Sequence, residues 1–563
     1  MTPSRRLSRP PRGSTILSAV AAFLAGAAVA LPPVAAGRGG LEAVLAGVSG
    51  ARFRAHVEFL ADDLLEGREA GTRGYDIAAR YVATELETLG LEPAGAGGSF
   101  LQPVPLLESR LVEGSLGLAR DGKSVDLVRG EDFLMRGDLR RTETRVSAPV
   151  VFAGYGVFAP ALGHDDYGDV DVRGKVIALL PDSPERFSSE ERAHFASRQL
   201  KAYEAARRGA VGVLLLHTPE AERRSPWKRF AGQSSGTATT WTSPDGVPED
   251  APGALAGRAT LGPSGVEKLF ALARLDVETA AAAARASKGR PIDLGVVATL
   301  ETRSEHRRFT SPNVVGRLAG SDPALARTHV LYTAHLDHEG VGPPVDGDAI
   351  YNGAYDNASG SAVLLETARA LAEARPRPRR SVLFAFVTAE EKGLLGSEFL
   401  AAHPTVPAES LVANVNVDMP LFLFPVADVL AYGADSSTLG DVARAAARHQ
   451  GLELSPDPVP EQNLFIRSDQ YSFVKRGVPA LFLMTGTRST DSSVDAAARW
   501  REFLTRHYHT PTDDLGRPMD LPSAERFIRT VVEIGWTVAR SSEPPRWTQG
   551  DFFARTFART RAD

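Results

Sequence analysis

Histidine and carboxylate side chains follow three apolar stretches of the sequence, each at the point where a buried strand would end. They are His335 and Asp337 after the first stretch, Glu390 and Glu391 after the second, and Asp418 after the third. Taken singly, such residues are often surface or capping residues. An unpaired charge at the tip of a buried strand is costly, however, and a metal ion removes that cost. The three strand ends together therefore predict a metal site.

The residue types also suggest how such a site would work. In the Glu390-Glu391 pair, one carboxylate can bind a metal while its neighbour takes a proton from an attacking water. The Asp337 carboxylate can accept the second ring N–H of His335 and so fix the tautomer of that imidazole. Because the chain contains no cysteine, any metal site must be built from His, Asp and Glu.

Two more segments supply candidates. Asp356 lies in a loop with glycines on both sides that opens into a helix, where its carboxylate could bridge two metals. The alternative is a turn and helix cap made by Asn357 or Ser359. Later in the chain, His507 and His509 compete for one role, because in an extended segment both side chains would share a face.

The elements that must position these residues repeat the order strand, loop, helix from residue 328 onward. Strands are expected at residues 330–333, 382–387 and 411–417, and helices at residues 359–373 and 437–450. Continuous apolar strands alternating with helices predict an α/β fold, with a largely parallel mixed sheet between layers of helices. Ligands of such sheets bind beyond the carboxyl ends of the strands, where the candidate residues lie.

The ordered motifs H-x-D, G-x-x-D-N-x-S-G, E-E-x-G-x-x-G-S, N-x-D-M and Y-H-T-P-x-D resemble those of a family of zinc-dependent aminopeptidases. That family includes bacterial leucyl aminopeptidases, glutamate carboxypeptidase and the inactive transferrin receptor. The resemblance covers residues 310–522 and, more loosely, 51–91, where two helices (54–65 and 75–89) flank the sequence GREAGT at 67–72. Two departures are Gln470, where many members have His, and Pro420.

The resemblance implies a zinc exopeptidase, most simply an aminopeptidase acting on peptides, with two zinc ions. It assigns the metal ligands as His335, Asp356, Glu391, Asp418 and His509. Asp356 would bridge the two ions, Glu390 would be the general base, and Asp337 would orient His335. His509 is preferred to His507 because it directly precedes Thr510-Pro511. The alternatives are a carboxypeptidase, a one-zinc glutaminyl cyclase, or a non-catalytic binding protein.

Residues 132–288 differ in texture, with short apolar strands expected at 149–156, 175–180 and 211–216 and a helix at 198–208. Residues 220–256 are expected to form a loop. The segment is similar to the protease-associated domain, so we expect a small β-rich insertion beside the active-site mouth whose strands do not pair with the main sheet. The predicted divisions are a signal peptide (1–36), two parts of the peptidase domain (37–131 and 289–545), the insertion between them, and a tail (546–563).

Composition narrows the possible partners and locations. At 563 residues the chain is too long for one core, and a formal charge of -5 provides no basic surface for nucleic acid. Four arginines between residues 5 and 12 precede an uncharged run from Gly13 to Gly37, which predicts a signal peptide and export to the periplasm or the medium. The alternative is an uncleaved anchor, the only case in which membrane contact is expected.

Overall fold

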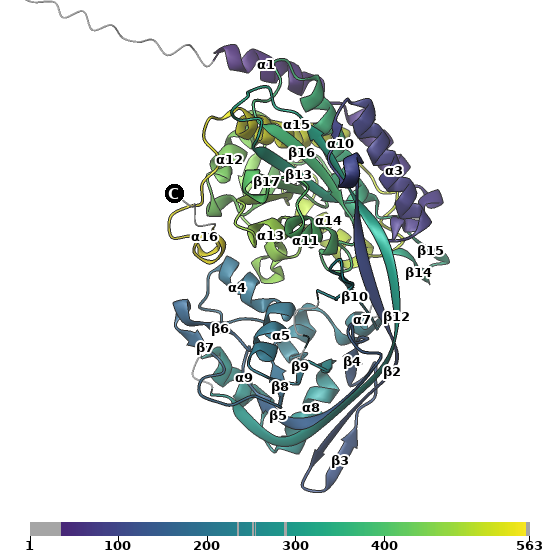
Figure 1. Ribbon diagram of the computed structural model, residues 1–563, viewed down its shortest axis with the longest axis vertical. Helices are drawn as coiled ribbons and strands as arrows, with labels where there is room; N and C mark the ends of the chain where they lie inside the picture. Colours follow the sequence, from purple (N-terminus) through teal and green to yellow (C-terminus); the bar gives the residue numbers. More distant parts are fainter. Residues whose placement is uncertain (1–34, 233–235, 250–252, 254, 287–289, 559–563) are drawn as a thin grey trace, which may run out of the picture.

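The computed structural model describes residues 35–232, 236–249, 253, 255–286 and 290–558. The predicted signal peptide, residues 1–36, thus lies almost wholly outside the described residues. Figure 1 shows two lobes joined along one side by two long strands, β2 (Leu101–Arg120) and β12 (Ile292–Leu318). Among the described residues, no helix combines the length and the apolar character that a membrane crossing requires.

The large lobe is built on a mixed sheet with the strand order β19-β18-β20-β17-β13-β16-β12. Its central strands β16, β13, β17 and β20 are parallel, whereas β12 and β18 pair antiparallel with β16 and β20. The strands that follow β12 in the chain are β13 (His329–His335), β16 (Ser381–Val387), β17 (Leu411–Val417), β18 (Asp428–Tyr432), β19 (Glu453–Ser455) and β20 (Ala480–Thr485).

Helices cover both faces of this sheet, which confirms the predicted fold class. One face packs against the helices α2 (Gly50–Leu60), α3 (Arg73–Thr88), α10 (Ser359–Glu373), α12 (Leu439–His449) and α15 (Leu521–Arg540). The other face packs against α11 (Leu395–Ala402) and α13 (Gln470–Val474). Every residue of β13 and β16 is buried, as expected for strands covered on both sides.

The contact between the sheet and α15 depends on a buried tyrosine of the sheet and a glycine of the helix. Tyr332 of β13 stacks on Phe384 of β16, with ring centroids 5.2 Å apart, and its hydroxyl donates to the carbonyl of Val531 at 2.8 Å. A Cβ at Gly535 would lie 1.7 Å from the Tyr332 hydroxyl. Only glycine at position 535 therefore lets the helix approach the tyrosine this closely.

The small lobe carries its own parallel strands in the order β5-β8-β9-β11, with β4 antiparallel at the edge. These strands are β4 (Phe133–Met135), β5 (Glu143–Phe152), β8 (Val176–Leu179), β9 (Gly212–Leu216) and β11 (Gly257–Leu261). Its helices include α5 (Arg198–Arg207), α8 (Pro263–Ala273) and α9 (Val277–Arg285). The strands and the helix expected within residues 149–216 are all present, although β5 begins before residue 149 and ends at Phe152, before the expected end at 156.

The structure differs from the prediction that strands of residues 132–288 stay out of the main sheet. β12 pairs with β5 over residues 292–303 and with β16 over residues 314–318, so one hydrogen-bonded ladder runs through both lobes. The prediction is wrong because a single long strand serves both lobes. The buried apolar clusters remain distinct, and Leu116 of β2 and Leu300 of β12 belong to the small-lobe cluster. Packing in the small lobe therefore extends beyond the predicted boundaries at 132 and 288.

Two other expectations also need correction. Residues 220–256, expected as loop, contain α6 (Pro219–Arg224), α7 (Trp227–Gly232) and β10 (Thr237–Trp241). β10 forms because it pairs antiparallel with β2, a partner distant in sequence. The segment 546–563, expected as a tail, includes α16 (Phe552–Phe557), whose Phe553 is fully buried in the large-lobe core.

Candidate metal centre and active site

The candidate residues come from the carboxyl ends of neighbouring strands. His335 is the last residue of β13, Glu390 and Glu391 follow β16, and Asp418 follows β17. Asp356 lies in the turn Ala354–Ala358 that leads into α10. Because parallel strands place their carboxyl ends at one edge of the sheet, these side chains meet there.

The carboxylate of Asp356 lies at the centre of the cluster. Its Oδ1 is 3.2 Å from Nε2 of His335, and its Oδ2 is 3.2 Å from Nε2 of His509. The same two imidazole nitrogens each have a second carboxylate beside them. Nε2 of His335 is 3.1 Å from Asp418 Oδ1, and Nε2 of His509 is 3.1 Å from Glu391 Oε2. Asp356 therefore stands between two pairs, each made of one imidazole and one carboxylate.

Strong electrostatic coupling follows from this crowding. Burial alone would lower the pKa of His335, but the carboxylates of Asp418 and Glu390 raise it well above its ordinary value. Burial likewise opposes ionisation of Asp356, yet the His335 and His509 imidazoles hold its pKa well below the usual range. The imidazoles thus favour the charged form of Asp356, and the carboxylates favour the charged form of His335.

The structure separates the two competing histidines. His509 joins the cluster, whereas Nδ1 of His507 lies 2.7 Å from the Thr512 hydroxyl and its Nε2 lies 3.1 Å from the Arg517 guanidinium. The segment is not extended: residues 503–507 form a helical turn and His509 has a φ of 55°. The two side chains consequently do not share a face.

Asp337 is buried beside the cluster, but it contacts His335 differently from the prediction. Nδ1 of His335 donates to the main-chain carbonyl of Asp337 at 3.1 Å. The Asp337 carboxylate instead accepts hydrogen bonds from the backbone N–H groups of Glu390 at 3.1 Å and Glu391 at 3.4 Å. A carbonyl oxygen can only accept, so in the neutral imidazole the contact still places the proton on Nδ1 and leaves the lone pair on Nε2.

The pKa values of the adjacent glutamates are shifted in opposite directions. Burial, with the nearby carboxylates of Glu391 and Asp418, raises the pKa of Glu390 well above its ordinary value despite the opposing influence of His335. Burial and Asp356 also act to raise the pKa of Glu391, but His509 and His338 outweigh them and lower it to about 2. Carboxylates driven apart in this way suit different roles, one as a proton acceptor and one as a permanent anion.

Two residues next to the H-x-D motif were missed. Nδ1 of the buried His338 lies 2.8 Å from Oε1 of Glu391, and Oε1 of Glu339 lies 3.3 Å from Nδ1 of His509. Each contact fixes the orientation of a predicted ligand. In the sequence, only their position directly after Asp337 indicated a role for His338 and Glu339. Polar residues that follow the same strand end would face the same crevice as His335 and Asp337.

Two other residues that the sequence analysis missed, Asp513 and Ser468, form hydrogen bonds that hold candidate ligands in place. The Asp513 carboxylate accepts the backbone N–H of Tyr355 at 2.9 Å and of Asp356 at 3.0 Å, which holds the turn carrying the central carboxylate. The hydroxyl of Ser468 donates to Oδ2 of Asp418 at 2.6 Å. Asp513 is the last residue of the Y-H-T-P-x-D motif, but the motif does not indicate that its carboxylate binds the backbone of Tyr355 and Asp356.

The donor set fits divalent metal ions. Nε2 of His509 is buried and has no hydrogen-bond partner among the described residues, although carboxylate oxygens of Glu391 and Asp356 lie within 3.2 Å of it. A buried imidazole nitrogen placed in this way, close to carboxylate oxygens without a hydrogen bond to them, suits a ligand of an ion. Imidazole and carboxylate donors without thiolates suit zinc, and also manganese or cobalt.

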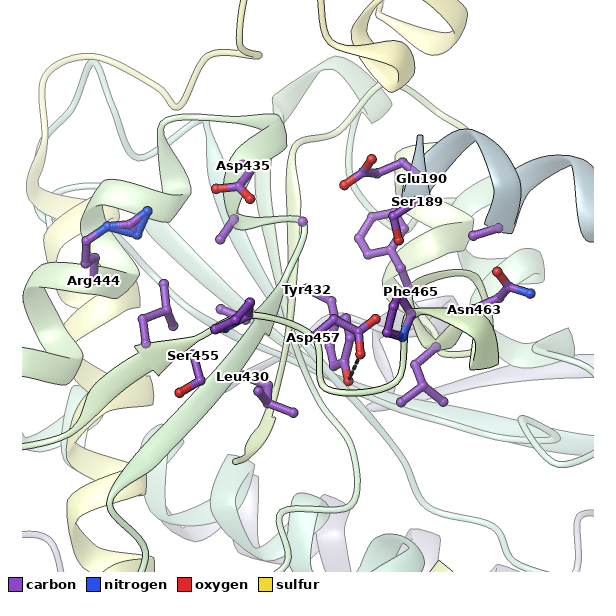
Figure 2. Close-up of a pocket in the computed structure, with 18 residues that line it drawn as sticks. Ser189, Glu190, Leu430, Tyr432, Asp435, Arg444, Ser455, Asp457, Asn463 and Phe465 are labelled. Carbon is purple, nitrogen blue, oxygen red and sulfur yellow. Dashed lines mark hydrogen bonds between the residues drawn. The ribbon is translucent and has the colours of Figure 1, made fainter. Parts of the chain in front are cut away.

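A sizeable cavity lies elsewhere, between the lobes. Its volume is about 590 Å³, and it is lined by α4 (Ser189–Ala196) of the small lobe and by residues around β18 and β19. Figure 2 shows Glu190 on one side of this cavity and Tyr432 and Asp457 on the other. None of the seven predicted site residues lines it.

The comparisons with known proteins agree with this geometry. Residues 313–535 match the model of peptidase family M28, and the match contains all seven predicted site residues. This segment is a peptidase family M28 domain. The M28 domain comprises most of the large-lobe sheet and leaves out the strands of the small lobe.

Curated relatives match parts of the chain. Aminopeptidase NAALADL1 of Mus musculus is 38% identical over 127 residues, which cover 21% of this chain and 15% of the relative. Leupeptin-inactivating enzyme 1 of Streptomyces exfoliatus is 27% identical over 263 residues, which cover 46% of this chain and 55% of the relative. The chain thus spans about one seventh and about half of the length of these two relatives.

One solved structure is similar over nearly its whole length. The aminopeptidase from Aneurinibacillus sp. strain AM-1 aligns with a TM-score of 0.52 and 18% identity, covering 90% of this chain and 97% of that chain. At this identity the likeness shows the fold alone.

Proposed function

We propose that the protein is a two-zinc exopeptidase, and specifically an aminopeptidase that removes N-terminal residues from peptides. The observation that carries the proposal is the position of Asp356, whose two carboxylate oxygens face the imidazole of His335 on one side and that of His509 on the other. A carboxylate so placed can bridge two ions. His335 and Asp418 would complete one ion's ligands, and Glu391 and His509 the other's.

The choice of an aminopeptidase is supported by the similar proteins. NAALADL1 carries the name aminopeptidase, as does the Aneurinibacillus protein, and the M28 domain contains the entire ligand set. Peptides with a blocked amine and peptides with a blocked carboxylate would separate an aminopeptidase from a carboxypeptidase. We further propose export from the cytoplasm, on the basis of the N-terminal sequence.

The chemistry that two divalent ions supply when bound is polarisation of the scissile carbonyl and a lower pKa for the attacking water. Glu390 is the residue of this chain that moves the proton. Its raised pKa suits a group that takes a proton from water and then delivers it to the leaving amine. Asp337 holds the backbone of both glutamates, and His338 and Glu339 fix the orientation of Glu391 and His509.

The adjacent glutamates provide the test. We expect Glu390→Gln to lose about 10²- to 10⁴-fold in turnover while zinc content and thermal unfolding stay near wild type, because Gln cannot accept the proton. Glu391→Gln should lose zinc as well as activity, because it removes an anionic ligand. Zinc content, thermal unfolding and the rate on aminoacyl substrates are measured on both variants.

Three results on these variants and on the wild type would contradict the proposal. A Glu390→Gln enzyme with near wild-type rate would remove this residue from catalysis. Zinc loss on Glu390→Gln but not on Glu391→Gln would exchange the two roles. A wild-type protein with full activity and one zinc per chain would refute the two-metal proposal.

A further inference from the structure

The turn formed by residues 66–69 lies against the loops that carry the candidate ligands, although it comes about 270 residues earlier in the chain. We refer to residues 66–69 as the clamp. It follows α2 and precedes α3, and it overlaps the GREAGT sequence at 67–72 that the proposed mechanism leaves without a role. Its central residue, Arg68, has only 1% of its surface exposed.

The guanidinium of Arg68 is bonded to main-chain carbonyls. Nε donates to Leu336 at 3.0 Å, Nη1 to Asn352 at 2.5 Å and Nη2 to Gly353 at 3.1 Å, and Nη1 also donates to Leu60. Leu336 lies between His335 and Asp337, and Gly353 directly precedes the turn that carries Asp356. One side chain thus joins the loop of the first histidine to the loop of the central carboxylate.

The backbone of the clamp packs tightly against the same loops. Glu66, Gly67 and Arg68 all have positive φ, of 49°, 69° and 51°. A Cβ at Gly67 would lie 2.4 Å from the Tyr351 carbonyl and 2.5 Å from the Gly340 carbonyl, so glycine is needed for the close approach. This close approach of the backbone brings the Arg68 side chain to the loops.

Two more contacts join the clamp to these loops, and the second of them reaches a third loop. The carbonyl of Arg68 accepts the backbone N–H of His338 at 3.3 Å. Glu69 forms an ion pair with Lys392 at 2.7 Å, directly after the Glu390-Glu391 pair. The clamp therefore contacts all three loops that supply Glu391, His335 and Asp356.

We propose that Arg68 is a positioning residue of the metal centre, fixing the separation between His335 and Asp356 through their neighbouring carbonyls. The inference rests on the proposed metal centre and adds to it. The planar guanidinium offers five donors in a fixed fork, and here it bonds to four carbonyls on three segments. Lysine has three donors on a single nitrogen and cannot span the same acceptors.

The surrounding charges agree with this role. The acids whose charges raise the pKa of Arg68 are those of the candidate centre and its support: Asp513, Asp337, Asp356 and Glu391. Burial lowers the pKa of Arg68 to about 10, against the opposing effect of these acids, so the side chain stays cationic near neutral pH. A fixed cation also moderates the repulsion among the carboxylates before metal binds.

The test compares Arg68→Lys with Arg380→Lys, a matched control in the same lobe. Arg380 is 2% exposed and donates to the Thr328 hydroxyl at 2.6 Å and the Ser542 carbonyl at 3.0 Å, at the opposite edge of the sheet. Zinc affinity is measured on metal-stripped full-length protein by competition with a chromogenic chelator. Thermal unfolding of the stripped proteins is recorded in parallel.

We expect Arg68→Lys to weaken zinc binding by about 10- to 100-fold, the range found when groups that orient metal ligands are lost. Arg380→Lys should bind zinc like wild type. Wild-type affinity in a folded Arg68→Lys protein would overturn the proposal. Absence of zinc binding by the wild type would instead refute the proposed function, so the two failures are distinguishable.

A second pair keeps the test decisive if Arg68→Lys does not fold. Glu69→Gln breaks the ion pair to Lys392, in which both side chains are partly exposed, and should weaken zinc binding several-fold. Its control is Glu398→Gln, which breaks the comparable ion pair with Lys475 at 2.5 Å. If Arg68→Lys does not fold and the two glutamine variants bind zinc equally well, the clamp does not position the centre.

Discussion

In the large lobe, the carboxyl ends of β13, β16 and β17 lead to imidazoles and carboxylates that crowd around Asp356. In the small lobe, the ends of β5 and β8 lead instead to main-chain carbonyls that accept hydrogen bonds from one lysine. Nζ of Lys201 donates to Tyr155 at 2.6 Å, to Leu180 at 3.0 Å and to the carbonyl of Asp182. Lys201 is 1% exposed.

The two edges share a topology and differ in charge. Each belongs to a set of parallel strands on the same hydrogen-bonded ladder, and each gathers groups that need a cation. The small lobe supplies that cation from its own chain, whereas the large lobe has an excess of carboxylates that suits ions from solution. Parallel strands thus provide the location, and the buried side chains decide whether it becomes a binding site.

The largest expected effect comes from removing the central carboxylate. Asp356→Asn should abolish peptidase activity and weaken zinc binding by more than about 100-fold, since loss of a ligand exceeds the effect of losing a group that orients one. Asp457→Asn, a partly buried acid of the cavity between the lobes, is the control and should leave both unchanged. Zinc content and rate are measured on the two variants. Equal zinc content would contradict the role of Asp356.

Removing the metal should affect the two lobes unequally. At free zinc of about 100 times the dissociation constant, binding stabilises a folded protein by about 2.7 kcal/mol, and the chelated protein loses this contribution. We expect faster amide hydrogen exchange in residues 335–340, 353–358 and 388–392 after chelation, with little change in β8 and β9. Equal acceleration in both lobes would show that the edges are not independent.

The sequence predicted those parts of the fold that depend on local pattern. The expected helix 359–373 and the strands ending at Val387 and Val417 agree with α10, β16 and β17, because buried apolar runs bounded by polar residues have few alternatives. The shared ribbon of β2 and β12 was missed because strand pairing depends on partners distant in sequence. The same reason explains β10 within the expected loop.

The site shows a similar division. Motif order identified the residues that converge on Asp356, but spacing alone did not decide between His507 and His509, since the φ of 55° at His509 is a feature of the folded backbone. The contact of Asp337 with His335 was predicted through the wrong oxygen. The role of Arg68 was not visible because its partners are main-chain carbonyls, which carry no residue identity.

A third expected effect concerns the buried lysine of the small lobe and leaves zinc binding unchanged. Burial lowers the pKa of Lys201 from 10.5 to about 7, so between pH 7 and 10.5 the unfolded chain binds a proton that the folded chain does not. Stability should therefore rise with pH across this window, by at most about 1.4 kcal/mol per pH unit, and stay flat below pH 7, where both states are protonated. Lys201→Met removes this titration, so the stability of wild type relative to the variant should increase from pH 7 to 9.5. The free energy of opening at β8 and β9, measured by hydrogen exchange, reports it. A difference independent of pH would mean that the three carbonyls keep the ammonium charged in the folded lobe, making it as permanent a cation as Arg68.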